Sequence, residues 1–126
     1  MLLGVSDLPK EDPVIQRLTP AELHDRIQRG EAVTVVDVRR EAALRADPRL
    51  IAGSFHSTLD DLLDHLDEMP RDNLIVFSCT CPAEESSTRA AELLIREGSR
   101  NVGVLVGGFI AWVDGGYPLN EVEAAA

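Results

Sequence analysis

The sequence has few basic residues for its size and no long hydrophobic run. Only 12 lysines and arginines accompany 22 aspartates and glutamates, so the 126 residues carry a formal net charge of −10. Nucleic acids and anionic membranes both require concentrated positive charge, so this balance disfavours either as a partner. No apolar run approaches the roughly 20 residues that cross a bilayer, and the short apolar start lacks the basic end of a signal peptide. We therefore expect a cytoplasmic protein.

Cysteine is scarce as well. The two cysteines, Cys79 and Cys81, are separated by a single residue. A disulfide across one residue would be strained, and secreted disulfide-rich domains space their cysteines widely. The pattern therefore indicates reduced thiols. Hydrophobic residues make up 44% of the chain, and its length suits one domain with an ordinary core.

Three short runs are apolar on both faces and rich in β-branched residues. They cover residues 32–38, 74–78 and 101–106, and a weaker strand is expected within residues 50–55. Continuous runs of this kind are typical of buried strands in a parallel sheet.

Helical patterns alternate with these runs. In the first, Thr19 suits the N-cap, Pro20 the first helical position and Glu22 a capping box, and Gly30 ends the helix. Further helices are expected at residues 59–69, with four leucines on one stripe, and at residues 87–97 and 109–113. Strands that alternate with helices predict an α/β domain with a mostly parallel sheet and helices on both faces.

The domain is expected to span residues 18–120. Residues 1–17 contain two prolines and no clear periodicity, which indicates an extended N-terminal segment, and residues 121–126 are expected to form a flexible C-terminal tail. Gly107 and Gly108 follow a strand without a P-loop pattern, so we interpret the pair as a tight turn in which a Cβ atom would clash.

Cys79 lies where a predicted strand leads through a short loop into a helix. In parallel α/β sheets, binding sites form at such points. Loop amides and the positive end of the following helix can hold an anion, and this environment lowers the pKa of a thiol. Cys79 is therefore a candidate nucleophile. The alternative is an inert thiol packed at a strand end, since cysteine also behaves as a small hydrophobic residue.

Several segments resemble the rhodanese family of sulfurtransferase-like domains in their order and spacing. The similarity runs from about residue 18 to residue 119. Its motifs are VVDVR at residues 35–39, IAGSFH at 51–56, the strand that ends at Cys79, the helix at 89–94, NVGVLVGGFIAW at 101–112 and GYP at 116–118. The resemblance implies a single rhodanese-like domain with a sheet of about five strands.

The resemblance also implies a chemistry. Cys79 would accept a sulfane sulfur as a persulfide and pass it to a thiol or other acceptor, without a cofactor. Donors would include thiosulfate, mercaptopyruvate or a persulfide, and a protein thiol is one acceptor. The residues of the implied active-site loop are Thr80, Cys81, Pro82, Ala83, Glu84, Glu85 and Ser86.

Asp37, Arg39 and Arg89 would support the loop. For Asp37 and Arg39, an ordinary salt bridge is an equally good interpretation.

The loop departs from the usual family pattern in two ways. Matching the strand places the nucleophile at Cys79, whereas matching the helix without gaps places it at Cys81. We favour Cys79, because a strand end fixes position better than a loop count. This choice requires either two extra loop residues or a helix that starts earlier, with Pro82 at its first position. Glu84 and Glu85 replace the usual basic character and resemble a variant C-x-C-P-x-E loop. Negative charge raises a thiol's pKa and repels dianionic donors such as thiosulfate.

The roles of several groups remain open at this stage. A glutamate of the loop could act as a general acid or base, face an amine-bearing partner, or simply favour the start of the helix. Cys81 could resolve a persulfide, bind zinc or be a spectator. Zinc would need further ligands, for which His56 and His65 are the nearest candidates, and we expect no metal.

Two other functions compete with sulfur transfer. The acidic loop and the net charge suit a non-catalytic rhodanese-like module that binds a basic partner. A related cysteine-dependent phosphatase would need an arginine to close a Cys-x5-Arg cradle, and position 85 is glutamate.

Overall fold

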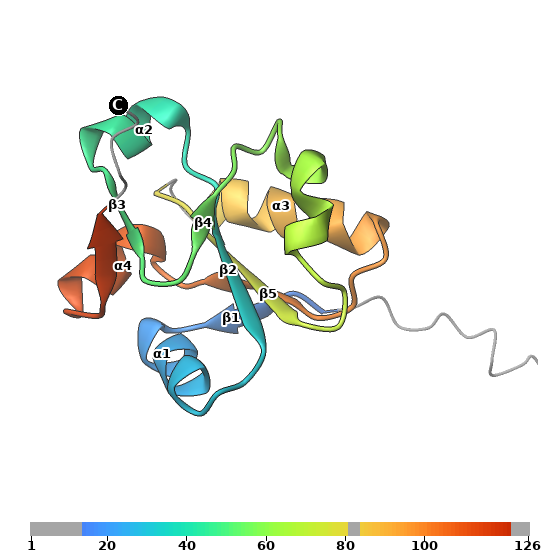
Figure 1. Ribbon diagram of the computed structural model, residues 1–126, viewed down its shortest axis with the longest axis horizontal. Coiled ribbons are helices and arrows are strands. Elements are labelled where there is room, and N and C mark those ends of the chain that lie inside the picture. The colour runs from blue at the N-terminus through green and yellow to red at the C-terminus, as the bar shows by residue number, and fades with distance from the viewer. Residues whose placement is uncertain (1–13, 81–83, 122–126) are drawn as a thin grey trace, which may run out of the picture.

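A parallel sheet of five strands forms the centre of the molecule (Figure 1). The computed structural model describes residues 14–80 and 84–121. The strands lie in the order β1-β6-β5-β2-β4, and every neighbouring pair is parallel. They are β1 (Gln16–Leu18), β2 (Val33–Asp37), β4 (Phe55–His56), β5 (Leu74–Ser78) and β6 (Val102–Leu105). The predicted α/β fold with a parallel sheet of about five strands is confirmed.

Helices cover both faces of this sheet. On one face, α1 (Pro20–Gln28) and α4 (Gly108–Asp114) bring Leu23, Phe109 and Trp112 against Val35 and Val76. On the other face, α3 (Glu85–Arg96) and the 3₁₀ helix η2 (Leu62–Glu68) pack against the remaining strand side chains. Because successive side chains of a strand point to opposite faces, both sides of β2 and β5 are buried, which explains their continuous apolar runs.

The capping box of the first helix is confirmed. The Glu22 amide donates to Thr19 Oγ1 at 3.1 Å, and the Thr19 amide donates to Glu22 Oε1 at 2.9 Å. These two bonds satisfy amides that the first helical turn leaves without a partner. The local sequence therefore decides where α1 starts.

Three elements that the sequence did not reveal complete the fold. Strand β1 includes Gln16 and Arg17, which were expected to belong to the N-terminal extension, and pairs with β6. A small antiparallel sheet joins β7 (Leu119–Glu121) to β3 (Arg49–Ile51), which overlaps the weaker strand expected within residues 50–55, and α2 (Glu41–Ala46) lies between β2 and β3. Each of these is too short to display a period in the sequence.

The helix expected at residues 59–69 is wrong in extent and type. Only Leu62–Glu68 is helical, as a 3₁₀ helix with non-helical dihedral angles at His65. With about three residues per turn, the leucines do not share one stripe. Leu62 is buried, whereas Leu63 and Leu66 are 41% and 36% exposed.

Helix α3 begins at Glu85, two residues before the predicted start.

In the described part of the chain, no helix is both long and apolar enough to cross a membrane.

Candidate functional site

Cys79 lies directly after β5, at the carboxyl end of the sheet. Its side chain is buried, with 1% of the residue exposed, and belongs to the apolar cluster on the α3 face. The neighbouring strand lies close, because the Val38 amide donates to the Ser78 carbonyl at 2.8 Å. The Cys79 carbonyl accepts the Phe109 amide at 3.0 Å, so the backbone of this residue is tied to the start of α4.

The glycine pair after β6 makes this approach possible. Gly107 and Gly108 have φ angles of 78° and 63°, in the left-handed region that favours glycine. A Cβ atom at Gly108 would overlap the Cys79 carbonyl oxygen, and one at Gly107 would come within 2.6 Å of Ala111 Cβ. The predicted tight turn is confirmed, and its backbone lies directly against the candidate nucleophile.

Glu84 ties the far end of the cysteine loop to the same turn. It is the N-cap of α3, with a left-handed φ of 54°, and its side chain does not cap that helix. Instead, Glu84 Oε1 accepts a hydrogen bond from Arg17 Nη2 at 2.8 Å, and Glu84 Oε2 accepts one from the Gly107 amide at 3.2 Å. The turn that contains Gly107 therefore contacts both ends of the segment between Cys79 and Glu84.

We expect the Glu84 carboxylate to contribute measurably to stability. Because hydrogen bonds to charged groups contribute roughly 1.5–3 kcal/mol, Glu84→Ala should lower the free energy of unfolding by about 2 kcal/mol. Glu84→Gly loses the same bonds but relieves the left-handed backbone, so it should be about 1 kcal/mol more stable than Glu84→Ala. Denaturant unfolding of both variants measures the difference, and equal stabilities would contradict a strained backbone at this position.

Asp37 and Arg39 form a buried ion pair rather than an exposed one. Both side chains are 1% exposed, and Arg39 Nε donates to Asp37 Oδ2 at 2.8 Å. The other guanidinium nitrogens donate to the carbonyls of Asp47 and Arg49 at 3.1 and 2.6 Å, and the group lies 3.9 Å from the Phe109 ring centre. These contacts fit the structural interpretation of the pair, because they join β2, the start of β3 and α4.

Burial raises the pKa of Asp37 above its ordinary value. Hydrogen bonds and the charge of Arg39 act in the opposite direction and limit the rise. The His56 ring also lies in this region, with Nε2 at 2.7 Å from the Arg39 carbonyl oxygen. The Arg39 amide also donates to Asp37 Oδ1 at 2.9 Å, so the pair holds the backbone where β2 ends. The loop-supporting role that the resemblance implies for Asp37 and Arg39 stays a prediction.

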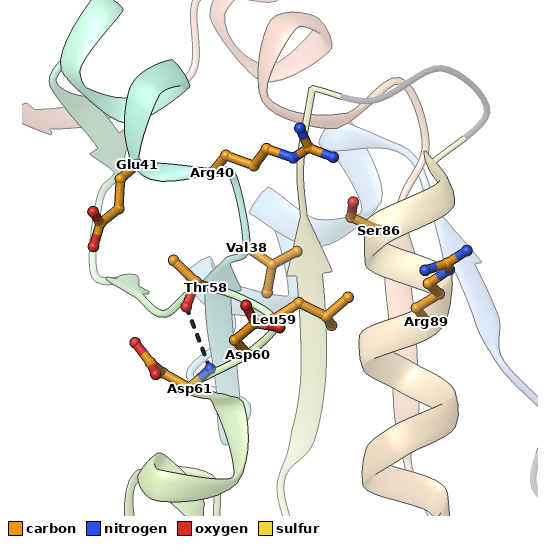
Figure 2. A pocket seen from close by; sticks show the side chains of 9 residues that line it. All are labelled: Val38, Arg40, Glu41, Thr58, Leu59, Asp60, Asp61, Ser86 and Arg89. Atoms are coloured by element: carbon orange, nitrogen blue, oxygen red, sulfur yellow. Dashed lines mark hydrogen bonds between the residues drawn. The ribbon is translucent and has the colours of Figure 1, made fainter.

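A cavity of about 640 Å³ opens at this end of the sheet (Figure 2). Val38 and Arg40 after β2, Thr58 and Asp60 after β4, and Ser86 and Arg89 on α3 contribute to its wall. Figure 2 shows the Arg40 side chain extending toward the carboxyl end of β5. Cys79 is not among the described lining residues, but Val38 is, and its amide donates to the carbonyl of Ser78, the residue before Cys79.

The remaining residues of the predicted active-site loop run from Thr80 to Glu85, and those that the structure describes are exposed, apart from Glu84. Thr80 is exposed, and Cys81, Pro82 and Ala83 lie outside the described residues. Glu85 is 67% exposed, and its carboxylate lies 3.6 Å from Arg89 Nη2, one helical turn on. Within residues 14–80 and 84–121, no group of three or more histidine, cysteine or carboxylate side chains is arranged to hold a metal.

Two arginines near the site were not predicted from the sequence. Arg17 reaches Glu84 from the first strand, and Arg40 lines the cavity immediately after the buried Arg39. Arg40 could have been inferred from its place next to the VVDVR strand end, since neighbouring residues at a strand end point in different directions. No local signal pointed to Arg17, because it contacts a residue far along the chain.

A comparison with models of protein families identifies the family of this chain. The model of the rhodanese-like domain matches residues 19–114, so the chain belongs to the rhodanese-like domain family. No match is found among curated proteins.

Solved structures share the fold over most of their length. A rhodanese-related protein from Thermoplasma volcanium is 29% identical, with a TM-score of 0.65 and coverage of 82% of this chain and 96% of that one. A Rhodopseudomonas palustris protein of unknown function, described as a possible tyrosine phosphatase, is 30% identical, with a TM-score of 0.69 and coverage of 84% and 85%. A rhodanese-like domain protein from Staphylococcus aureus is 24% identical, with a TM-score of 0.69 and coverage of 87% and 100%.

Proposed function

We propose that this protein is a sulfurtransferase or sulfur carrier that forms a persulfide on Cys79. The observation that supports the proposal is the position of Cys79 between the end of β5 and the start of α3 in a rhodanese-like domain. A helix N-terminus favours negative charge, so the start of α3 suits the anionic thiolate and persulfide.

Two displacements make up the proposed reaction. The Cys79 thiolate attacks the transferable sulfur of the donor, a bond forms from Sγ to that sulfur, and the bond that held it to the rest of the donor breaks. This is a sulfur–sulfur bond in thiosulfate or a persulfide and a carbon–sulfur bond in mercaptopyruvate. The electron pair leaves with sulfite, a thiolate or the enolate of pyruvate, respectively. An acceptor thiolate then attacks the outer sulfur of the Cys79 persulfide, which releases Cys79 as a thiolate. No net oxidant or reductant is needed.

The acidic residues of the loop have structural partners that support this role. The Glu84 carboxylate accepts hydrogen bonds from Arg17 and Gly107, and Glu85 lies beside Arg89. Each carboxylate is thus compensated by a neighbouring donor, which weakens its repulsion of an anionic sulfur. We infer that Glu84 holds the loop and does not act as a general acid or base.

Intact mass after incubation with thiosulfate, mercaptopyruvate or polysulfide tests the proposal. The expected result is a gain of one sulfur that is lost in Cys79→Ser and retained in Cys81→Ser. A gain lost only in Cys81→Ser would move the nucleophile to Cys81. If no donor adds sulfur to either thiol, the proposal is wrong.

The burial of Cys79 favours one competing function. Only 1% of the residue is exposed, as expected for a thiol that packs as part of the core. A non-catalytic module that binds a partner at the same end of the sheet would leave Cys79 unmodified by sulfur donors and slow to react with iodoacetamide. The alkylation rate of the native protein, compared with that of the unfolded chain, separates the two functions.

The description of the Rhodopseudomonas palustris relative raises phosphatase activity, which we do not propose for this chain. A phosphate cradle of the Cys-x5-Arg type needs a cation at position 85, where this protein has an exposed glutamate. A phosphatase rate that disappears in Cys79→Ser would overturn this conclusion.

A further inference from the structure

Several serine hydroxyls in the described part of the chain are buried without a hydrogen-bond partner, and one of them lies on the helix that follows the cysteine loop. They belong to Ser54, Ser78, Ser87 and Ser99. Buried polar groups are satisfied in most proteins, so each exception calls for an explanation. Ser87 is the third residue of α3, one position beyond the predicted active-site loop, and 0% of it is exposed.

The place of Ser87 in α3 explains why its hydroxyl has no partner within the helix. A serine inside a helix commonly donates to the carbonyl four residues earlier. Because α3 starts at Glu85, the corresponding carbonyl for Ser87 precedes the helix. The hydroxyl hydrogen of Ser87 is therefore available to an acceptor outside α3.

The helical period directs Ser87 toward the layer of side chains that contains Cys79. Residues three, four and seven positions after Ser87 share its face of the helix. They are Ala90, Ala91 and Leu94, which are buried in the same apolar cluster as Cys79. Because β5, α3 and β6 form a crossover between parallel strands, α3 begins at the carboxyl end of the sheet, near the end of β5 (Figure 1). Ser87 is thus the residue of this buried face that lies nearest to that end.

The turn after β6 holds Cys79 and the start of α3 together. The Phe109 amide donates to the Cys79 carbonyl at 3.0 Å, and the Gly107 amide donates to Glu84 Oε2 at 3.2 Å. Ser87 follows Glu84 by less than one helical turn, which is a rise of about 4.5 Å. Cys79 and the first turn of α3 are therefore attached to the same short segment, on the buried side that Ser87 shares.

We propose that the Ser87 hydroxyl donates a hydrogen bond to Cys79 Sγ when this sulfur is a thiolate, both as it attacks the donor and as it leaves the persulfide. The inference rests on the sulfur transfer proposed above and adds a catalytic residue to that site. A thiol is a weak acceptor, whereas a charged sulfur attracts a hydroxyl donor strongly, so the bond forms with the thiolate. Ser87 keeps its proton throughout, and the bonds that form and break are those of the displacements given above.

Titration of the thiolate tests this hydrogen bond. In a Cys81→Ser background Cys79 is the single cysteine, and the ultraviolet absorbance of its thiolate follows its ionisation, with Cys79→Ser/Cys81→Ser as the blank. A hydrogen bond to the charged form favours that form, so Ser87→Ala should move the midpoint to higher pH by about one unit. Below the midpoint the rate of sulfur loading should fall by about tenfold, because less thiolate is present.

Other buried serines provide matched controls. Ser99 lies just past the opposite end of α3, and Ser78 precedes Cys79 in the chain, so their side chains point to opposite faces of the sheet. The hydroxyls of both serines are buried without a partner, as that of Ser87 is. Ser78→Ala and Ser99→Ala should leave the midpoint where it is in the parent protein. An unchanged midpoint in Ser87→Ala, or equal changes in all three variants, would overturn the inference.

The titration also separates this inference from the proposed reaction, because it needs no sulfur donor. If a donor loads Cys79 but Ser87→Ala has the midpoint of the parent protein, the inference fails alone. If no donor loads Cys79 but Ser87→Ala moves the midpoint, the proposed function fails and the hydrogen bond from Ser87 to the sulfur is supported. Since the hydroxyl has no partner to lose in the described structure, Ser87→Ala should not lower the free energy of unfolding, so a fold defect does not account for the change.

Discussion

Arg39→Met is expected to lower the free energy of unfolding by about 3–5 kcal/mol, because it leaves Asp37 buried without its ion-pair partner. Asp37 is 1% exposed and depends on Arg39 for its side-chain hydrogen bonds. The substitution also removes the donors that hold the carbonyls of Asp47 and Arg49. Denaturant unfolding monitored by the fluorescence of the buried Trp112 measures the loss.

The loss of stability in Arg39→Met should depend on pH and should be smaller at acidic pH. Burial already raises the pKa of Asp37, and loss of Arg39 removes the interactions that limit the rise. A group whose pKa is raised on folding stabilises the folded state below its unfolded pKa, and this contribution disappears as the pH rises through the folded value. The free energy of unfolding of the variant should therefore be closest to that of the wild type at acidic pH, and the difference should grow toward neutral pH.

The chain offers a matched control with the same spacing. Asp47 and Arg49 also form an aspartate–arginine pair two residues apart, at 2.7 Å, but their side chains are 36% and 39% exposed. The hydrogen bond from Arg49 lowers the pKa of Asp47, so that pair's contribution is present at neutral pH and is lost as the pH falls. Arg49→Met should change stability far less than Arg39→Met, since exposed pairs are screened by solvent.

A double variant distinguishes an orphaned charge from lost packing. Asp37→Leu/Arg39→Met removes both charges, so it should be more stable than Arg39→Met alone. If the double variant is less stable than the single one, the destabilisation does not come from the uncompensated carboxylate, and the explanation given for Arg39 is wrong.

Gly108→Ala is the second change with a large expected effect. Alanine in the left-handed region costs roughly 1–2 kcal/mol, and the added Cβ atom would overlap the Cys79 carbonyl oxygen. Backbone must move to accept it, so we expect a total loss of about 3 kcal/mol or more in the free energy of unfolding. Because the overlap is with Cys79 itself, the rate of sulfur loading or alkylation of Cys79 should change as well.

Gly116→Ala provides the control for backbone conformation alone. Gly116 has a similar φ of 77°, but no atom lies within 4 Å of the position that its Cβ would occupy. In this variant the free energy of unfolding should fall only by the roughly 1–2 kcal/mol that alanine costs in the left-handed conformation, and the reactivity of Cys79 should not change. Equal losses in the two variants would show that the contact between Gly108 and Cys79 is unimportant.

The fold could be predicted from the sequence wherever a local pattern is strong. The buried runs that became β2, β5 and β6 are apolar because both faces of these strands are covered, and such runs are visible without any tertiary information. The start of α1 was equally visible, because the partners in its capping box are three residues apart. The turn at Gly107 and Gly108 was visible because tight turns select for glycine.

Short elements and long-range contacts could not be predicted in this way. The leucines of residues 59–69 suit an α-helix, but a 3₁₀ helix places Leu63 and Leu66 at the surface. Glu84 looked like an acidic residue of the loop or of the helix start, and only the fold brings Arg17 to it, from 67 residues away. The same holds for the cavity, whose walls come from the segments that follow β2 and β4 and from α3.

By itself, the sequence determined the α/β class, the buried strands, the start of the first helix and the place of Cys79 at a strand end. These features depend on hydrophobic periodicity and on caps within a few residues, which short-range interactions decide. Only the tertiary structure decided that Asp37 and Arg39 are buried together, that Glu84 bonds to the Gly107 amide, and that Arg40 lines a cavity at the carboxyl end of the sheet. Those features depend on which strand ends become neighbours in the sheet, and the parallel order of the strands sets that arrangement.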